Sequence, residues 1–155
     1  MLTRAFSIIA ALSLFLQSAC GGPHEYSVVA PLPVSDAAAA LSRADARARQ
    51  LGYTTYYDDQ GRQRLHDLGF TNLMVGALLV AEKEHKCGLL HITGCRRSEV
   101  VFLVLPSEAT SLVVSAWVVE RTNFLEGYHT KSVSNEVRAD ADTLKAAALA
   151  GQSGH

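Results

Sequence analysis

The segment that most constrains the fold is Thr110–Arg121, the longest run of strand-forming residues in the chain. Successive side chains of a strand point to opposite faces of its sheet. One side of this strand would therefore present Val113, Trp117 and Val119, and the other side Leu112, Val114, Ala116 and Val118. Apolar residues on both sides predict a central strand that is covered on both faces for most of its length.

Three further segments are expected to join that strand in a sheet. Val100–Leu105 is a buried strand, and the short connection after it predicts an antiparallel hairpin with the long strand. Tyr26–Ala30 is a first strand, closed by prolines. Residues 73–86 are ambiguous, because they are good helix formers but contain Gly76. We favour a strand over Val75–Glu82, since the neighbouring strands need a partner.

Two segments have the three- and four-residue apolar spacing of amphipathic helices. They are residues 37–51, which Gly52 would end, and the segment after Ser134, which has its apolar residues at Val137, Ala141, Leu144 and Ala148. Between them, Tyr53–Tyr57 and Arg62–Leu68 are expected to pair as a hairpin, because Asp58–Gly61 has the composition of a turn.

The order of these elements predicts an α+β fold: an antiparallel sheet of about five strands with two helices packed on one face, in a single domain over residues 26–151. The order resembles the helix-grip arrangement of some small lipoproteins of the bacterial cell envelope. That resemblance concerns element order alone and implies no functional residues.

The N-terminus has the composition of a secretory signal peptide: a charge at Arg4, then the apolar run Ala5–Leu16. The run is shorter than the roughly 20 apolar residues that span a bilayer. Ser18-Ala19-Cys20 resembles the end of the lipobox of bacterial lipoproteins. The resemblance implies that residues 1–19 are removed, that the Cys20 thiol takes a diacylglyceryl group, and that residues 20–25 form the lipidated N-terminus and tether.

One position departs from the lipobox pattern. An aliphatic residue usually stands three residues before the cysteine, and this chain has Gln17 there. Cleavage by the ordinary signal peptidase, giving a soluble periplasmic or secreted protein, is therefore an open alternative. If the chain is a lipoprotein of a cell with two membranes, Gly21 after the cysteine implies transport to the outer membrane, facing the periplasm.

With Cys20 assigned to lipid, Cys87 and Cys95 remain as a pair. An oxidising periplasm favours a disulfide between them. The alternative is a zinc site that uses both thiolates together with His85 and His91, which are suitable ligand types at a spacing that matches no zinc signature. We favour the disulfide and expect no metal or other cofactor.

A possible binding loop follows the long strand, since polar loops at strand ends often contain binding groups. Its candidate residues are Glu120, Arg121, Asn123, Tyr128 and His129. His129 with Glu120 is the one pair suited to acid–base chemistry. The alternative interpretation is that Glu120-Arg121 is only a solvent-exposed strand end and that the loop after it is only a connection. Trp117 is expected in the core.

The formal net charge of −1 provides no field that would attract nucleic acid. No nucleophile motif, phosphate loop or dinucleotide fingerprint is recognisable. We therefore expect a lipid-anchored envelope protein with a structural or partner-binding role rather than an enzyme. The alternative is a carrier with an apolar pocket between sheet and helices, which a cavity beside the Trp117 strand would favour. A metal protein or an enzyme is a third hypothesis.

Overall fold

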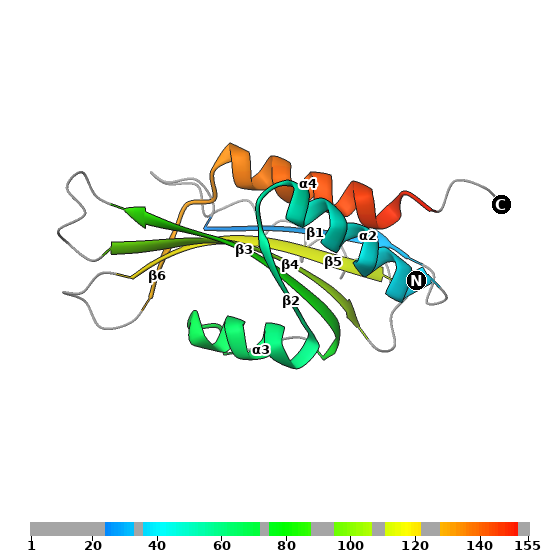
Figure 1. Cartoon of the computed structure of the whole chain (residues 1–155), viewed down its shortest axis with the longest axis horizontal. Helices are drawn as coiled ribbons and strands as arrows, with labels where there is room; N and C mark the ends of the chain where they lie inside the picture. Colours follow the sequence, from blue (N-terminus) through cyan, green and yellow to red (C-terminus); the bar gives the residue numbers. More distant parts are fainter. Residues whose placement is uncertain are drawn as a thin grey trace, which may run out of the picture.

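The computed structural model describes residues 24–32, 36–71, 75–87, 95–106, 111–121 and 128–151 (Figure 1). Its elements in chain order are β1 (Glu25–Pro31), α2 (Ala37–Gln50), β2 (Thr54–Tyr57), α3 (Asp58–Asp67), β3 (Gly76–Cys87), β4 (Cys95–Pro106), β5 (Ser111–Arg121), β6 (His129–Lys131) and α4 (Asn135–Leu149). The predicted signal peptide, Cys20, His91 and Asn123 lie outside the described residues.

The six strands form one antiparallel sheet in the order β1-β5-β4-β3-β2. β1 runs along the first part of β5, where Glu25 lies opposite Trp117. β6 occupies the same edge of β5 further on, with His129 opposite Glu120. β5 therefore lies between β4 on one side and β1 and β6 on the other, which confirms that the Thr110–Arg121 segment forms a central strand.

α2 and α4 cover one face of the sheet, which we call the α2/α4 face (Figure 1). Small side chains let the helices approach closely: Ala40, Ala44 and Ala48 of α2 and Ala141 of α4 are fully buried. They pack in one continuous core with the sheet residues Leu79, Leu103, Leu112 and Val114. The amphipathic stripes of both helices are confirmed.

Polar side chains fasten these two helices at their edges. Arg43 of α2 donates to the carbonyl oxygens of Ala147 and Ala148, at 3.3 and 2.7 Å. It thus satisfies carbonyl groups that the end of α4 leaves without helical partners. On the sheet side, Tyr26 donates to Asp142 of α4 at 2.6 Å, and Tyr53 donates to Asp140 at 2.8 Å.

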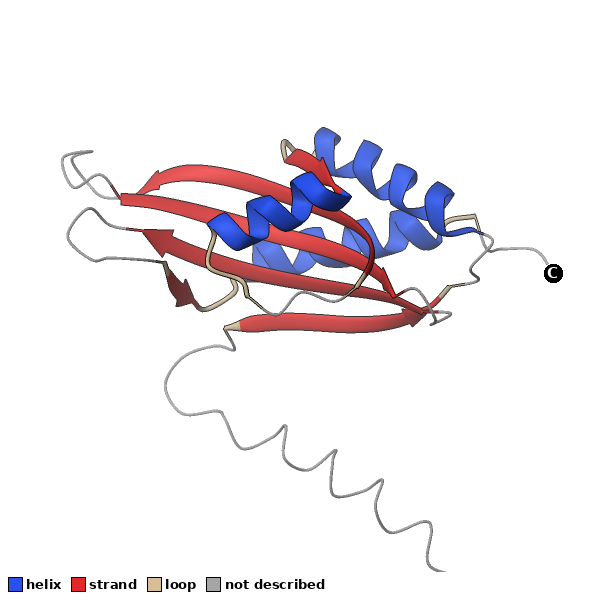
Figure 2. Cartoon of the chain, turned by 90° about the horizontal axis from the view of Figure 1, so that it is seen from below, coloured by secondary structure: helices blue, strands red, loops and turns tan. Residues whose placement is uncertain are grey.

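The prediction that Arg62–Leu68 forms the second strand of a hairpin is wrong. Asp58–Asp67 is the helix α3, which follows β2 directly and packs against β2 and β3 on the opposite face of the sheet (Figures 1 and 2). The two aspartates that indicate a turn also suit the first turn of a helix, because they lie near its positive end. Gly61 lies inside α3, and a Cβ atom there would be only 3.0 Å from Val80. The glycine that resembled a turn residue thus permits close packing of helix on strand.

The other strand and helix assignments hold in the described residues. The strand favoured over Val75–Glu82 is confirmed, since Gly76–Cys87 is the long strand β3, and β4 and β5 are antiparallel neighbours. Ser134 caps α4, since its Oγ accepts a hydrogen bond from the Val137 amide. The fold class is α+β with an antiparallel sheet, as predicted, and the third helix lies on the face opposite α2 and α4.

Candidate functional site

The second face of the sheet, which we call the α3 face, is only partly covered. α3 and its flanking residues bury Leu65 and Leu68 against Leu78, Val80 and Val100 in a smaller core. Figure 2 shows α3 over the half of the sheet that contains β2 and β3, whereas β1 on the same face has no helix over it. Val29 of β1 is accordingly 65% exposed. A binding surface on the described sheet is therefore expected here.

The end of α3 places an aromatic ring over this face. Gly69 has φ +93°, and its amide donates to the carbonyl of His66 while the Phe70 amide donates to that of Leu65. This is the Schellman arrangement, in which the residue after the glycine turns back over the last helical turn. Phe70 consequently lies edge-on to Trp117 of β5, with ring centroids 5.3 Å apart, and to Phe102 of β4, at 6.1 Å.

A cavity of 220 Å³ lies between this aromatic group and the sheet, and we call it the Trp117 pocket. Its apolar walls are Leu65, Phe70, Leu78, Phe102, Val104 and Trp117. The volume exceeds that of an engineered cavity of about 150 Å³ that binds benzene. The pocket can therefore hold a ring-sized apolar group.

The wall of the pocket on the β1 side is polar. Glu25, Ser27 and Ser115 line it, and the two serine hydroxyls are 3.0 Å apart. Glu25 lies directly opposite Trp117 in the β1–β5 register, and such neighbours have Cβ atoms about 5 Å apart. The Trp117 indole nitrogen is buried and lacks a hydrogen-bond partner among the described residues.

A second hollow of 310 Å³ adjoins the first on the same face. Phe70 and Trp117 line both hollows, so these two rings form the partition between them. The far walls of the second hollow include Leu68, Val119 and Tyr128. Together the two hollows extend along β5 from the part that pairs with β1 to the part that pairs with β6.

A buried ion pair holds α3 in place above the sheet. Glu82 of β3 is 4% exposed, and Arg64 of α3 donates to both of its carboxylate oxygens, at 2.6 and 2.8 Å. Hydrogen bonding to Glu82 raises the pKa of Arg64 above its ordinary value, and desolvation opposes this effect. Because Arg64 and the pocket residue Leu65 are adjacent in α3, this pair fixes the position of one pocket wall.

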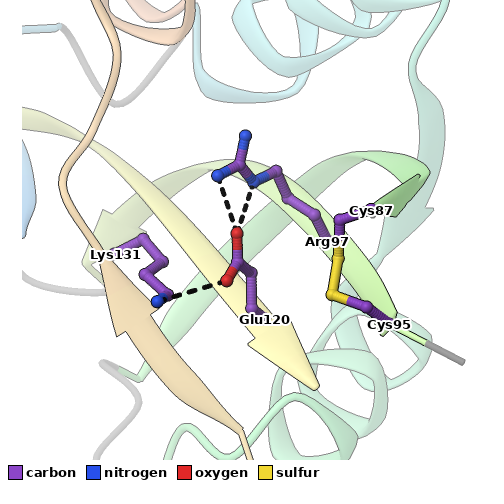
Figure 3. The surroundings of a disulfide bond; sticks show 5 residues. All are labelled: Cys87, Cys95, Arg97, Glu120 and Lys131. Carbon is purple, nitrogen blue, oxygen red and sulfur yellow. Dashed lines mark hydrogen bonds and ion pairs between the residues drawn. A yellow bond between two sulfur atoms is a disulfide. The ribbon is translucent and has the colours of Figure 1, made fainter. Parts of the chain in front are cut away.

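At the far end of the sheet, Cys87 and Cys95 form the predicted disulfide (Figure 3). They are directly opposed at the ends of β3 and β4, with Cα atoms 5.1 Å apart. The thiolates required by the zinc alternative are therefore absent. His85 instead lies 3.3 Å from Glu99, and the described residues contain no cluster of metal-ligating side chains.

The predicted binding loop divides between the two faces. Glu120 lies on the α2/α4 face, where Arg97 approaches it at 2.7 Å and Lys131 at 3.3 Å (Figure 3). Arg121 is stacked over Tyr128, 5.7 Å from the ring centroid, and Tyr128 packs against the core of the α3 face. His129 is exposed and lies opposite Glu120 in the register. Arg97 and Lys131 thus already pair with the Glu120 carboxylate, which the acid–base hypothesis requires to be free.

Sequence reasoning missed the residues that form the pocket. Trp117, expected in the core, is only partly buried and lines both hollows. Phe70 was not singled out, because it follows α3 and belongs to no periodic segment. The available signal was Leu68-Gly69-Phe70, in which a glycine between two apolar residues is typical of a helix end.

Comparisons with known proteins add no assignment: no protein-family model matches the chain, and no curated protein matches it either. Among the described helices, none has the length and apolar character needed to cross a membrane.

Proposed function

We propose that the chain is a lipid-anchored protein of the cell envelope whose domain binds a partner and performs no catalysis. The observation that supports export is the Cys87–Cys95 disulfide, because such bonds persist in oxidising compartments and are rare in the cytosol. The N-terminal segment, with its lipobox-like Ser18-Ala19-Cys20, supports acylation at Cys20 and location at the outer membrane.

A binding role accords with the geometry of the two candidate regions. Glu120 is neutralised by Arg97 and Lys131, which leaves His129 without the free carboxylate that acid–base chemistry would use. The α3 face, by contrast, offers exposed apolar surface at Val29 and two hollows on either side of Phe70 and Trp117. Such a surface suits recognition of an apolar group.

The anchor is tested by metabolic labelling with a fatty-acid analogue in the native host, followed by fractionation. Cys20→Ala should abolish labelling and release the protein from the membrane, whereas Ser18→Ala, which keeps a small residue, should leave both unchanged. Gln17→Leu restores the aliphatic position of the lipobox and should speed processing. Undiminished labelling of Cys20→Ala would refute the anchor.

The second candidate function is a small-molecule carrier, and the Trp117 pocket favours it. The α2/α4 side of the sheet holds the larger core, and the Trp117 pocket lies on the side that α3 covers. A volume of 220 Å³ is below the roughly 300–1,000 Å³ of typical drug-sized sites, so the cargo would be small or would extend into the adjoining hollow.

A further inference from the structure

We infer that the Trp117 pocket binds a small organic amine that has an apolar ring. This inference rests on the carrier candidate and specifies its ligand. Two observations define that ligand: the size and apolar lining of the cavity, and the position of Glu25 beside it.

The ring follows from the walls. Seven apolar side chains, the six named above and Val113, surround a space of 220 Å³, and three of them are the aromatic rings Phe70, Phe102 and Trp117. Phe70 makes edge-to-face contacts with both other rings, at interplanar angles of 79° with Trp117 and 73° with Phe102. Filling this space with a single ring removes apolar surface from water on both partners, which favours binding.

The positive charge follows from Glu25. Among the described residues it is the only charged side chain that lines the pocket, and it lies opposite Trp117 across the β1–β5 pair. A carboxylate beside an aromatic ring attracts an ammonium group, since the negative face of the ring reinforces the charge. The same arrangement repels a carboxylate or a phosphate, so anionic ligands are disfavoured.

The test uses the mature protein purified from the cell envelope, in lipid nanodiscs, isotope-labelled at tryptophan. Trp117 is the only tryptophan in the chain, so its indole N–H gives a single resonance in a nitrogen–proton correlation spectrum. The probes are para-methoxybenzylamine, its neutral analogue para-methoxybenzyl alcohol and the anion para-methoxybenzoate. The amine should shift this resonance in a saturable way.

Two comparisons measure the charge preference. The methoxy amine should bind roughly two- to fivefold more tightly than the alcohol, as for a solvent-exposed ion pair, and the benzoate more weakly than either. Glu25→Gln should abolish the preference for the amine over the alcohol, while the matched Glu136→Gln, on the exposed start of α4, should keep it.

Ser27→Leu is the blocking variant, because Ser27 lies on the exposed edge strand and a leucine there would enter the pocket without disturbing the core. It should weaken every probe. Equal binding of amine and benzoate would overturn the charge assignment. If no probe, including the alcohol, shifts the Trp117 resonance, the carrier function fails with the inference. The lipid anchor is tested separately by the labelling of Cys20.

Discussion

The Arg64–Glu82 pair supports a quantitative prediction, because it joins the helix that forms the pocket wall to the sheet below it. Arg64→Met keeps much of the side-chain volume but removes the charge, which leaves the Glu82 carboxylate buried without its partner. Breaking a buried ion pair on one side costs about 3–5 kcal/mol. The Arg64 side chain is 27% exposed, so solvent screening places the expected loss near the lower end, at about 3 kcal/mol.

The assay is urea unfolding of the mature protein, followed through Trp117 fluorescence and far-ultraviolet circular dichroism. For a protein of this size, about 3 kcal/mol corresponds to a fall of roughly 1–2 M in the midpoint. Replacing both partners, Arg64→Met with Glu82→Leu, should recover most of the loss, since two apolar groups need no counter-charge. The matched control is Arg49→Met, which breaks an exposed pair with Asp45 and should cost less than about 1 kcal/mol.

Two results would refute this reasoning. One is a loss below about 1 kcal/mol for Arg64→Met, which would mean that water reaches Glu82 and the pair contributes little. The other is a double variant that is as unstable as the single one. In that case the loss would come from packing of the Arg64 side chain and would not depend on the uncompensated charge.

Further predictions concern the disulfide, the tyrosine network and the helix cap. Replacing Cys87 and Cys95 by serine should lower the free energy of unfolding by about 2–3 kcal/mol, measured in urea, because the bond closes a short loop; unchanged stability would contradict this. Desolvation, followed by the hydrogen bond to Asp142, raises the pKa of Tyr26 to about 12 from 10.0. The folded state thus favours the neutral phenol, so its stabilising effect is complete below about pH 10 and is lost as the pH rises towards 12; Tyr26→Phe should flatten that decline in alkaline unfolding curves. Ser134→Ala should cost about 1 kcal/mol in thermal unfolding, with no change in the native circular dichroism spectrum.

The elements that sequence reasoning predicted correctly are those whose pattern is local and long. In β5, apolar residues face both sides of the sheet for most of the strand. In α4, the buried residues from Val137 to Ala148 repeat at helical spacing. The disulfide was predictable because two cysteines remained once Cys20 was assigned to lipid. β6 has three residues, all exposed, and so gives no periodic signal.

The α3 helix was missed because local preference and tertiary packing point in different directions. Asp58, Asp59 and Gly61 favour a turn when they are considered alone. In the folded chain the Asp58 carboxylate accepts a hydrogen bond from the Leu78 amide at 3.1 Å, and Gly61 lies close against Val80. Both contacts are made with β3, about twenty residues away, and are invisible to a window of ten residues.

That error also explains why the binding face was not foreseen. Two helices on one face, as predicted, leave the other face without a helix, so no pocket is expected there. Trp117 was assigned to the core because it lies in an apolar central strand. A short helix on the second face changes this outcome, because ten residues cover only part of a sheet of this width. The Schellman motif at the end of α3 directs Phe70 towards Trp117. The contact between the two rings covers a cavity, which a longer helix would have filled. The pocket thus depends on where α3 ends, and Gly69→Ala, which strains the backbone at φ +93°, should displace Phe70 from Trp117 and shift the Trp117 indole resonance.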